Sequence, residues 1–261
     1  MNDKNALIGY SGFVGSTLLK QTNFDYLYRS INISDIQNKS FDMVICAGAP
    51  AVKWMANKNP ENDRESIKSL ISHLSTVKCR VFILISTVDV FTDPVNVNES
   101  SLIDTSGLCP YGLHRYELEQ YVRNTFENHL IVRLPGLVGP GLKKNIIYDL
   151  LNRNNLDVVD CRSLFQFYPM VNLWADIKIA LSHSYTLVHL TSEPVSVECI
   201  GRECFSLDFN NKVLGAPIKY DFKSELGHVF SSNTQYQYSK KEVLLAIRAY
   251  AQSEVIKEQV I

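Results

Sequence analysis

Short apolar runs alternate with helical stretches through the first half of the chain. The runs predict strands over residues 6–8, 25–28, 42–47, 80–85 and 130–133. Between them, apolar residues at helical spacing predict helices over residues 12–21, 59–77 and 111–128. The run at residues 80–85 is nearly all apolar, which is typical of a parallel strand covered on both faces. Strict alternation of strand and helix predicts an α/β fold with a doubly wound parallel sheet.

A glycine-rich turn follows the first apolar run. Gly9, Gly12 and Gly15 are spaced three apart and lead directly into the helix-like residues 16–20. Gly9 permits a tight turn, Gly12 a close approach of a pyrophosphate to the backbone, and Gly15 tight packing of helix on strand. The spacing differs from the commonest dinucleotide fingerprint, Gly-x-Gly-x-x-Gly, and glycines this dense also occur in ordinary loops. The position directly after a strand favours dinucleotide binding.

The pattern loosens in the second half of the chain. Only about 20 residues separate the ends of the second and third predicted strands, which leaves room for roughly one helical turn at residues 33–38. After Pro135, a loop rich in glycine and proline precedes further predicted helices and one strand, at residues 145–152, 174–182, 240–251 and 187–190. No linker or repeat is visible, so a second lobe would be interwoven with the first.

Composition and charge narrow the function. The 261 residues include 26 basic and 27 acidic ones, a balance that predicts no nucleic-acid partner. The six cysteines form no Cys-x-x-Cys pair and the six histidines lack metal-ligand spacing, so we expect reduced thiols and no metal. The chain shows no secretory signal and no apolar run of membrane-spanning length. These features predict a cytoplasmic protein with no membrane partner.

Hydroxyl side chains end the fourth apolar run. Ser86 and Thr87 close this run, at the sheet edge where doubly wound folds bind ligands, although they could equally cap or turn the chain. Further on, Tyr111 and Arg115 are four apart and share one face of a predicted helix. A phenol beside a fixed cation has its ionised form favoured, and so exchanges a proton nearer neutral pH. The alternative is a helix-starting tyrosine with a solvated arginine.

Together these motifs resemble the extended short-chain dehydrogenase/reductase family, and within it the dTDP-4-dehydrorhamnose reductases and the neighbouring sugar-nucleotide epimerases. The resemblance covers most of the chain and rests on residues 9–15, 47–49, 86–91, 111–115, 133–141 and 193–197. It implies a Rossmann-type core over residues 1–141 that also takes in about 172–200, and a small interwoven substrate-binding lobe over residues 142–261.

The resemblance also implies an activity, which is the NAD(P)H-dependent reduction of a keto group of a nucleotide-linked deoxysugar. One alternative is epimerase or dehydratase action with tightly held NAD. Another is a non-catalytic sensor or scaffold that binds a dinucleotide. Relatives often pair through helices that include the tyrosine motif, which is consistent with a homodimer.

Roles for single residues follow from the resemblance. Tyr111 takes the place of the general acid, Thr87 hydrogen-bonds the reacting oxygen, and Arg115 positions the ribose and tunes Tyr111. Thr87, Asp89 and Asn145 are expected to bind the substrate. Besides Tyr111 and Arg115, the expected cofactor-binding residues are Gly9, Ser11, Gly12, Phe13, Val14, Gly15, Arg29, Ser30, Ala47, Gly48, Ala49, Ile85, Ser86, Leu134, Pro135 and Gly136.

One position departs from the family's pattern. The family motif is Tyr-x-x-x-Lys, and its lysine holds the nicotinamide ribose and lowers the pKa of the tyrosine. Arg115 stands at that position here. Arginine keeps the positive charge, but its planar fork does not copy a compact ammonium group. Either Arg115 does this work in an altered geometry, or the enzyme is slow or specialised, or the chain binds a dinucleotide without catalysis.

The end of the second predicted strand bears on the choice of cofactor. An acidic residue there suits the ribose hydroxyls of NAD, whereas an arginine can meet the 2′-phosphate of NADP. Arg29 and Ser30 therefore favour NADP(H), with NAD(H) as the alternative. Asp35 lies close enough in sequence to leave the assignment open, and Arg29 could also be a solvated loop residue.

Overall fold

A computed structural model describes residues 4–230 and 232–254. Its contacts divide the chain into two units. The first unit comprises Met1–Thr92, Ser100–Leu134 and Leu173–Val188, and the second comprises Asp93–Glu99, Pro135–Asn172 and His189–Ile261. In this division residues 135–141 and 189–200, which the sequence analysis assigned to the core, group with the second unit.

Within the described residues, the first unit is built on a six-stranded sheet. The strands are β1 (Asn5–Ile8), β2 (Tyr26–Tyr28), β3 (Ser40–Cys46), β4 (Lys78–Thr87), β6 (His129–Leu134) and β10 (Leu187–His189). Their order across the sheet is β10-β6-β4-β3-β1-β2. The pairs β1–β2, β1–β3, β3–β4 and β4–β6 are all parallel. The predicted doubly wound parallel sheet is confirmed.

The strand order places a topological switch point next to β1. The chain runs from β1 outward to β2 and then returns to β3 on the opposite side of β1. Only the short 3₁₀ helix η1 (Ile33–Ile36) lies on the way back, which matches the single turn expected from the sequence. Open α/β sheets bind their ligands at such a switch point, beyond the carboxyl ends of the strands.

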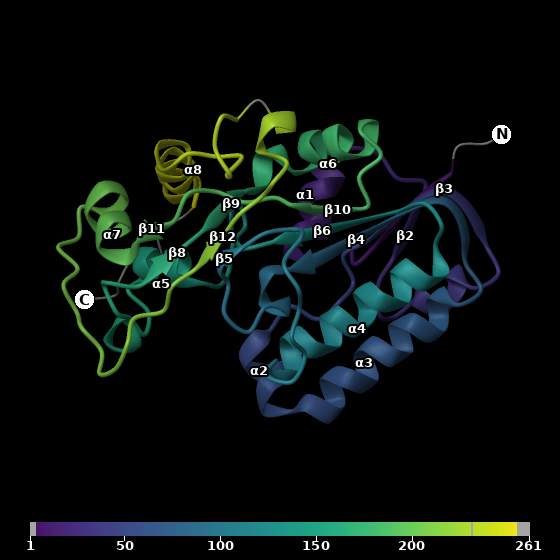
Figure 1. The fold of residues 1–261 in the computed structure, drawn as a ribbon, viewed down its shortest axis with the longest axis horizontal. Helices are drawn as coiled ribbons and strands as arrows, with labels where there is room; N and C mark the ends of the chain where they lie inside the picture. Colours follow the sequence, from purple (N-terminus) through teal and green to yellow (C-terminus); the bar gives the residue numbers. More distant parts are fainter. Residues whose placement is uncertain (1–3, 231, 255–261) are drawn as a thin grey trace. The chain divides into compact units, whose positions relative to one another are not determined.

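Helices cover both faces of this sheet. Figure 1 shows α3 (Pro60–Leu74) and α4 (Pro110–Thr125) side by side on one face, and α1 (Phe13–Gln21) and α6 (Leu173–Ser182) on the other. Both α3 and α4 begin with a proline. Proline has no backbone N–H, but an N–H at the first position of a helix has no partner within the helix, so nothing is lost. The short helix α2 (Lys53–Lys58), which the sequence analysis missed, contacts α3 and α4.

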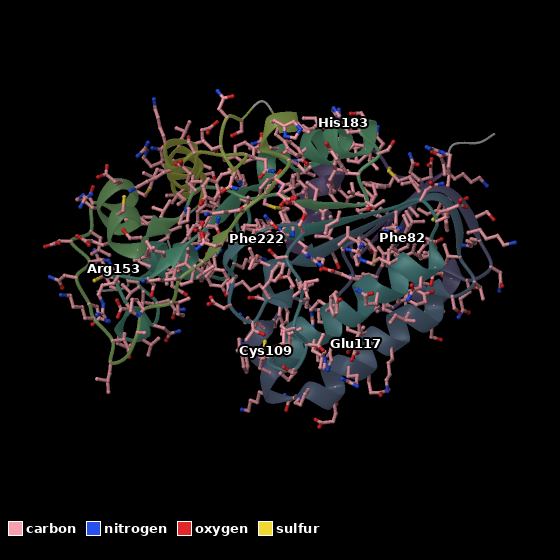
Figure 2. The ribbon with its side chains drawn as sticks, in the orientation of Figure 1. Phe82, Cys109, Glu117, Arg153, His183 and Phe222 are labelled. Atoms are coloured by element: carbon pink, nitrogen blue, oxygen red, sulfur yellow. The ribbon has the colours of Figure 1, made fainter. Side chains whose placement is uncertain are left out.

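The core of the first unit lies around the central strands. Phe82 of β4 is fully buried and stacks on Phe126, with 4.1 Å between the ring centroids; Figure 2 labels Phe82. Ile67, Leu70 and Leu74 of α3 pack into the same cluster. The helical spacing of these three residues predicted this buried face.

The second unit consists of short elements. It contains the helices α5 (Ile146–Asn152), α7 (Val197–Phe205) and α8 (Lys240–Ser253), and the 3₁₀ helices η3 (Leu156–Val158), η4 (Met170–Asn172) and η5 (Gly227–Phe230). The strands pair as β7 (Gly136–Val138) with β9 (Phe167–Pro169), β8 (Leu164–Phe165) with β11 (Val195–Ser196), and β5 (Val95–Val97) with β12 (Asp221–Phe222). The buried amide of Gln166 joins several of these segments, since it donates to Thr191 and accepts from Phe222.

Candidate functional site

Two glycines of the N-terminal turn are required by the chain itself. Gly9 has φ +84°, and a Cβ there would lie 2.3 Å from the carbonyl oxygen of Ala47. A Cβ on Gly15 would lie 2.1 Å from the carbonyl oxygen of Gly9. Any side chain at either position would collide with backbone. These glycines allow the tight turn and the close packing of α1 on the turn.

Gly12 differs from its two neighbours. Its φ is −78°, it is exposed, and a Cβ there would meet only the Gly9 oxygen at 3.4 Å, an ordinary contact. Gly12 directly precedes α1, and the first N–H groups of a helix have no partner within it. The missing side chain therefore leaves the backbone open to an anionic group at a helix N-terminus. Ser11 is exposed beside it, while Phe13 and Val14 are half-buried.

The ends of β1 and β3 meet at the switch point. The Ala47 N–H donates to the Ile8 carbonyl oxygen at 2.9 Å. A Cβ on Gly48 would lie 2.9 Å from the Cγ2 atom of Ile8, and Ala49 packs against the core of the unit. The small residues predicted to line a dinucleotide thus lie beside the glycine turn.

Arg29 and Ser30 are exposed just beyond β2. The Arg29 guanidinium carbon lies 5.7 Å from the centroid of the Tyr10 ring, in cation–π geometry. Tyr10 belongs to the glycine turn, so the structure brings the predicted cofactor-selecting arginine next to that turn. Asp35, the competing acidic residue, lies exposed on η1.

Tyr111 and Thr87 come together at the carboxyl edge of the sheet. Thr87 is the last residue of β4, and Tyr111 is the second residue of α4. The Thr87 hydroxyl is close enough to the Tyr111 phenol to favour its ionised form. The Thr87 Oγ1 atom also accepts the backbone N–H of Asp89 at 3.1 Å, which caps the 3₁₀ helix η2 (Val88–Val90). Gly112 makes the approach feasible, because a Cβ there would lie 2.0 Å from the Asp89 carbonyl oxygen. The sequence analysis did not single out Gly112.

The environment of Tyr111 keeps its phenol protonated. Burial raises the pKa of Tyr111 above its ordinary value, and the charge of Asp89 raises it further. The charges of Arg115 and Lys53, together with the nearby Thr87 hydroxyl, act in the opposite direction. The expectation that Arg115 favours the ionised form holds for the arginine alone, but burial outweighs it. The net pKa is raised rather than brought nearer to neutral pH.

Arg115 is buried, with 3% of its side chain exposed. Its Nη1 atom lies 2.5 Å from Oδ2 of Asp63, and its Nη2 atom lies 2.8 Å from Oδ1 of the same residue. The guanidinium also donates to the carbonyl oxygens of Tyr111 and Pro50. Its central carbon lies 4.0 Å from the centroid of the Tyr111 ring. The alternative of a solvated arginine is wrong, because the cation is packed against the ring face of the tyrosine and held by a carboxylate.

Asp63 completes this buried cluster. The Asp63 Oδ2 atom lies 2.7 Å from Nδ1 of His114. Burial alone would raise the pKa of Asp63, but hydrogen bonds from Arg115 and His114 hold that pKa below its ordinary value. Sequence reasoning missed Asp63. The available signal was its position four residues before Ile67, on the apolar face of α3.

The Ser86 hydroxyl is buried and contacts a carboxylate. It lies 2.5 Å from Oε1 of Glu119, which also pairs with Arg133 through a 2.6 Å contact. All three side chains are buried and join β4, α4 and β6. The Ser86 hydroxyl therefore neither caps nor turns the chain but belongs to a buried polar cluster, and its predicted cofactor contact stays a prediction. Ile85, before it, is half-buried within β4.

The remaining predicted residues lie at the ends of other segments. Leu134 ends β6, is buried, and stands opposite Thr87 in the sheet register. Pro135 and Gly136 begin a stretch of the second unit. A Cβ on Gly136 would lie 2.7 Å from the Gln166 carbonyl oxygen, so this glycine is required for strand packing.

Asn145, in the second unit, caps α5. It has φ 104°, and its side-chain oxygen accepts the N–H of Ile147 at 2.9 Å. Its amide donates to the carbonyl oxygen of Leu137 at 2.9 Å. Both ends of the Asn145 amide thus bond to nearby backbone, and the predicted contact of Asn145 with substrate stays a prediction.

Three further observations concern the described part of the chain, residues 4–230 and 232–254. No cluster of three or more His, Cys, Asp or Glu side chains there could hold a metal ion. None of its helices combines the length and apolarity needed to cross a membrane. All six cysteines lie in these ranges and are free thiols.

Comparison with known proteins finds similar structures but no matching sequence or family model. No protein-family model matches the chain. No curated protein sequence matches it either. Solved structures match it over nearly its whole length, which shows that the chain has a Rossmann-type α/β fold.

More particularly, the fold is the version seen in nucleotide-sugar reductases and epimerases. A dTDP-4-dehydrorhamnose reductase from Yersinia enterocolitica aligns with a TM-score of 0.72 and 16% identity over 97% of this chain and 100% of the other. RMD from Pseudomonas aeruginosa, complexed with NADPH, gives 0.73 and 15% over the same shares. A mutant UDP-glucuronic acid 4-epimerase from Bacillus cereus, in complex with NAD and a fluorinated UDP-sugar, gives 0.73 and 16% over 96% and 98%.

Proposed function

We propose that this chain is an NAD(P)H-dependent oxidoreductase that reduces a keto group of a nucleotide-linked deoxysugar. The observation that carries the proposal is the meeting of Tyr111 and Thr87 at the carboxyl edge of the parallel sheet, with the Arg115 guanidinium packed against the Tyr111 ring. The glycine turn belongs to the same unit. The likeness to dTDP-4-dehydrorhamnose reductases supports the substrate class.

The residues of the first unit fit a bound dinucleotide. A Cβ on Gly12 would fill the space in front of the α1 N-terminus. The backbone conformation and the neighbouring atoms at Gly12 would both allow a side chain, so neither requires a glycine there. Pyrophosphate is the anion that such a turn accommodates. Arg29 and Ser30 favour NADP(H), and similar structures hold NADPH, NADP or NAD. When bound, the reduced nicotinamide supplies a hydride to the carbonyl carbon.

The protein supplies the proton. Tyr111 donates its O–H proton to the carbonyl oxygen, while Thr87 orients the phenol and hydrogen-bonds the same oxygen. A raised pKa suits this role, because an acid holds its proton at every pH below its pKa. Turnover should therefore persist at neutral pH and fall only as the pH rises through the pKa of Tyr111. Asp89 and Asn145 are our proposed substrate contacts.

The buried ion pair suggests what Arg115 contributes. Its donors engage Asp63 and two carbonyl oxygens, and its guanidinium supports the Tyr111 ring. We therefore assign it the tuning and support of Tyr111 rather than the grip on the ribose that the resemblance implied.

The test is the absorbance of NADPH, and separately of NADH, with purified protein and a panel of nucleotide-linked 4-keto-6-deoxysugars. Oxidation that depends on one sugar supports the reductase, and Tyr111→Phe should abolish it. Cofactor binding without consumption across the whole panel contradicts the proposal and favours a non-catalytic sensor.

Epimerase or dehydratase action with tightly held NAD is the second candidate. The similar fold of the UDP-glucuronic acid 4-epimerase favours it. NAD retained through purification, with interconversion of sugars and no net consumption of cofactor, would identify this activity. A homodimer and a cytoplasmic location complete the proposal, and sedimentation of the purified protein tests the dimer.

A further inference from the structure

We propose that Lys53 is a positioning residue that sets the acidity of Tyr111 through Asp89 and Thr87. The proposal rests on the proposed function to the extent that Tyr111 is the proton donor. It concerns a residue of α2, a helix that the sequence analysis did not predict.

A chain of side chains leads from Lys53 to the phenol. The Lys53 Nζ atom lies 2.8 Å from Oδ1 of Asp89. The Asp89 Oδ2 atom lies 3.5 Å from Oγ1 of Thr87, and the Thr87 hydroxyl is close enough to the Tyr111 phenol to favour its ionised form. Lys53 keeps 44% of its side chain exposed, whereas Asp89 keeps 17%. Lys53 is therefore on the solvent side of the pair, and Asp89 is on the side of the Thr87 and Tyr111 hydroxyl groups.

Backbone contacts hold this arrangement in place. The Asn57 Oδ1 atom, one turn after Lys53 on α2, accepts the backbone N–H of Tyr111 at 3.0 Å. The start of α4 also rests on η2, where Gly112 meets the Asp89 carbonyl oxygen. Helix α2, the segment with Asp89 and the first turn of α4 are therefore in direct contact with one another.

The charged groups that face Tyr111 are Arg115, Asp89 and Lys53. Arg115 favours the ionised phenol, although its guanidinium is also paired with Asp63. The carboxylate of Asp89 opposes ionisation of the phenol, since it places a like charge beside the phenolate. Lys53 offsets this carboxylate. Without Lys53, the carboxylate of Asp89 would oppose ionisation more strongly, and Tyr111 would be a weaker acid.

In the proposed reaction, Lys53 affects the transfer of one proton from Tyr111. When the Tyr111 O–H bond breaks, the proton moves to the carbonyl oxygen of the substrate and the phenol becomes a phenolate. Lys53 lowers the free energy of that phenolate relative to a site with Asp89 alone. Its removal should slow the proton transfer without affecting how the dinucleotide binds.

A titration without substrate tests the proposal. Tyrosine is replaced throughout by 3-fluorotyrosine, whose more acidic phenol titrates closer to neutral pH, and the ¹⁹F signal of position 111 is assigned by its loss in Tyr111→Phe. We expect Lys53→Met to move the titration midpoint to higher pH, Lys53→Arg to restore it, and Asp89→Asn to move it to lower pH. Lys58→Met, at the exposed far end of the same helix, is the matched control and should leave the midpoint unchanged.

A midpoint in Lys53→Met that coincides with the wild-type value overturns the proposal, as does an equal shift in Lys58→Met. Where sugar-dependent turnover is found, Lys53→Met should lower kcat at neutral pH about three- to tenfold and shift the alkaline fall of kcat upward, with KM for the dinucleotide unchanged. An absence of turnover in the wild-type protein would count against the proposed function alone, because the ¹⁹F titration needs no substrate.

Discussion

The glycine turn and the tyrosine end of the first unit are built in different ways. At the turn, backbone meets backbone, and side chains at Gly9 and Gly15 are excluded by contacts with residues close in sequence or on the adjoining strand. At the tyrosine end, the geometry depends on a buried ion pair between Asp63 and Arg115, which are 52 positions apart. Local steric requirements leave a visible spacing in the sequence, whereas a distant charge pair leaves none.

The largest effect should come from removing the proposed acid. Tyr111→Phe keeps the ring that Arg115 packs against and removes only the hydroxyl. We expect kcat to fall about 100- to 10,000-fold while dinucleotide affinity changes little. Stopped-assay turnover and fluorescence titration of NADPH measure the two quantities. If the variant kept wild-type turnover, Tyr111 would not be the proton donor, and the proposed division between a binding turn and a catalytic tyrosine would be wrong.

Next comes the ion pair itself. Arg115→Ala leaves Asp63 as a buried charge without its main partner, and should lower the free energy of unfolding by about 3–5 kcal/mol in urea denaturation. Asp63→Asn combined with Arg115→Gln should cost less than Arg115→Ala alone. Arg80→Ala, which breaks an exposed pair with Asp42, is the control and should cost under about 1 kcal/mol. Equal losses for Arg115→Ala and Arg80→Ala would contradict a structural role for the buried pair.

A matched pair of glycine substitutions then separates folding from binding. Gly15→Ala places its Cβ against the Gly9 oxygen and should lower stability by about 1–3 kcal/mol. Gly12→Ala meets no such obstacle, so stability should change by under about 0.5 kcal/mol. Its dinucleotide affinity should still fall about tenfold or more, because the backbone approach is blocked. Unchanged affinity in Gly12→Ala would remove the argument for a pyrophosphate at this turn.

The smallest expected effect concerns cofactor choice. Arg29→Ala should weaken NADPH binding by about tenfold, which is 1.4 kcal/mol, and leave NADH binding little changed. Isothermal titration with each cofactor measures both affinities. Equal losses for NADPH and NADH would mean that Arg29, through its contact with Tyr10, supports the turn rather than reading a 2′-phosphate.

Most of the sheet could be predicted because its signals are local. The buried strand β4 and the apolar face of α3 were visible as runs and as spacing. Helix α2 was missed because its six residues are too short for a periodic pattern. The small paired strands of the second unit, such as β7 with β9, were missed because pairs of two or three residues depend on partners distant in sequence.

The sequence predicted which residues belong to the candidate site, but not how each side chain is buried or which groups it contacts. Thr87 and Tyr111 were expected together, and Thr87 is among the groups that influence the Tyr111 phenol. The same reasoning did not show that Ser86 turns toward Glu119, or that burial raises the pKa of Tyr111. Both outcomes depend on packing between strands and α4, which no local pattern encodes.

The segment from Ala47 to Asn57 reaches both ends of the site. Its first residue packs against Gly9, Lys53 pairs with Asp89, and its last residue holds the N–H of Tyr111. This one stretch of chain therefore fixes both the turn proposed to hold a dinucleotide and the start of the helix that carries the tyrosine. A change in the length of this stretch would displace both regions at once, even though single side chains in each can be altered separately.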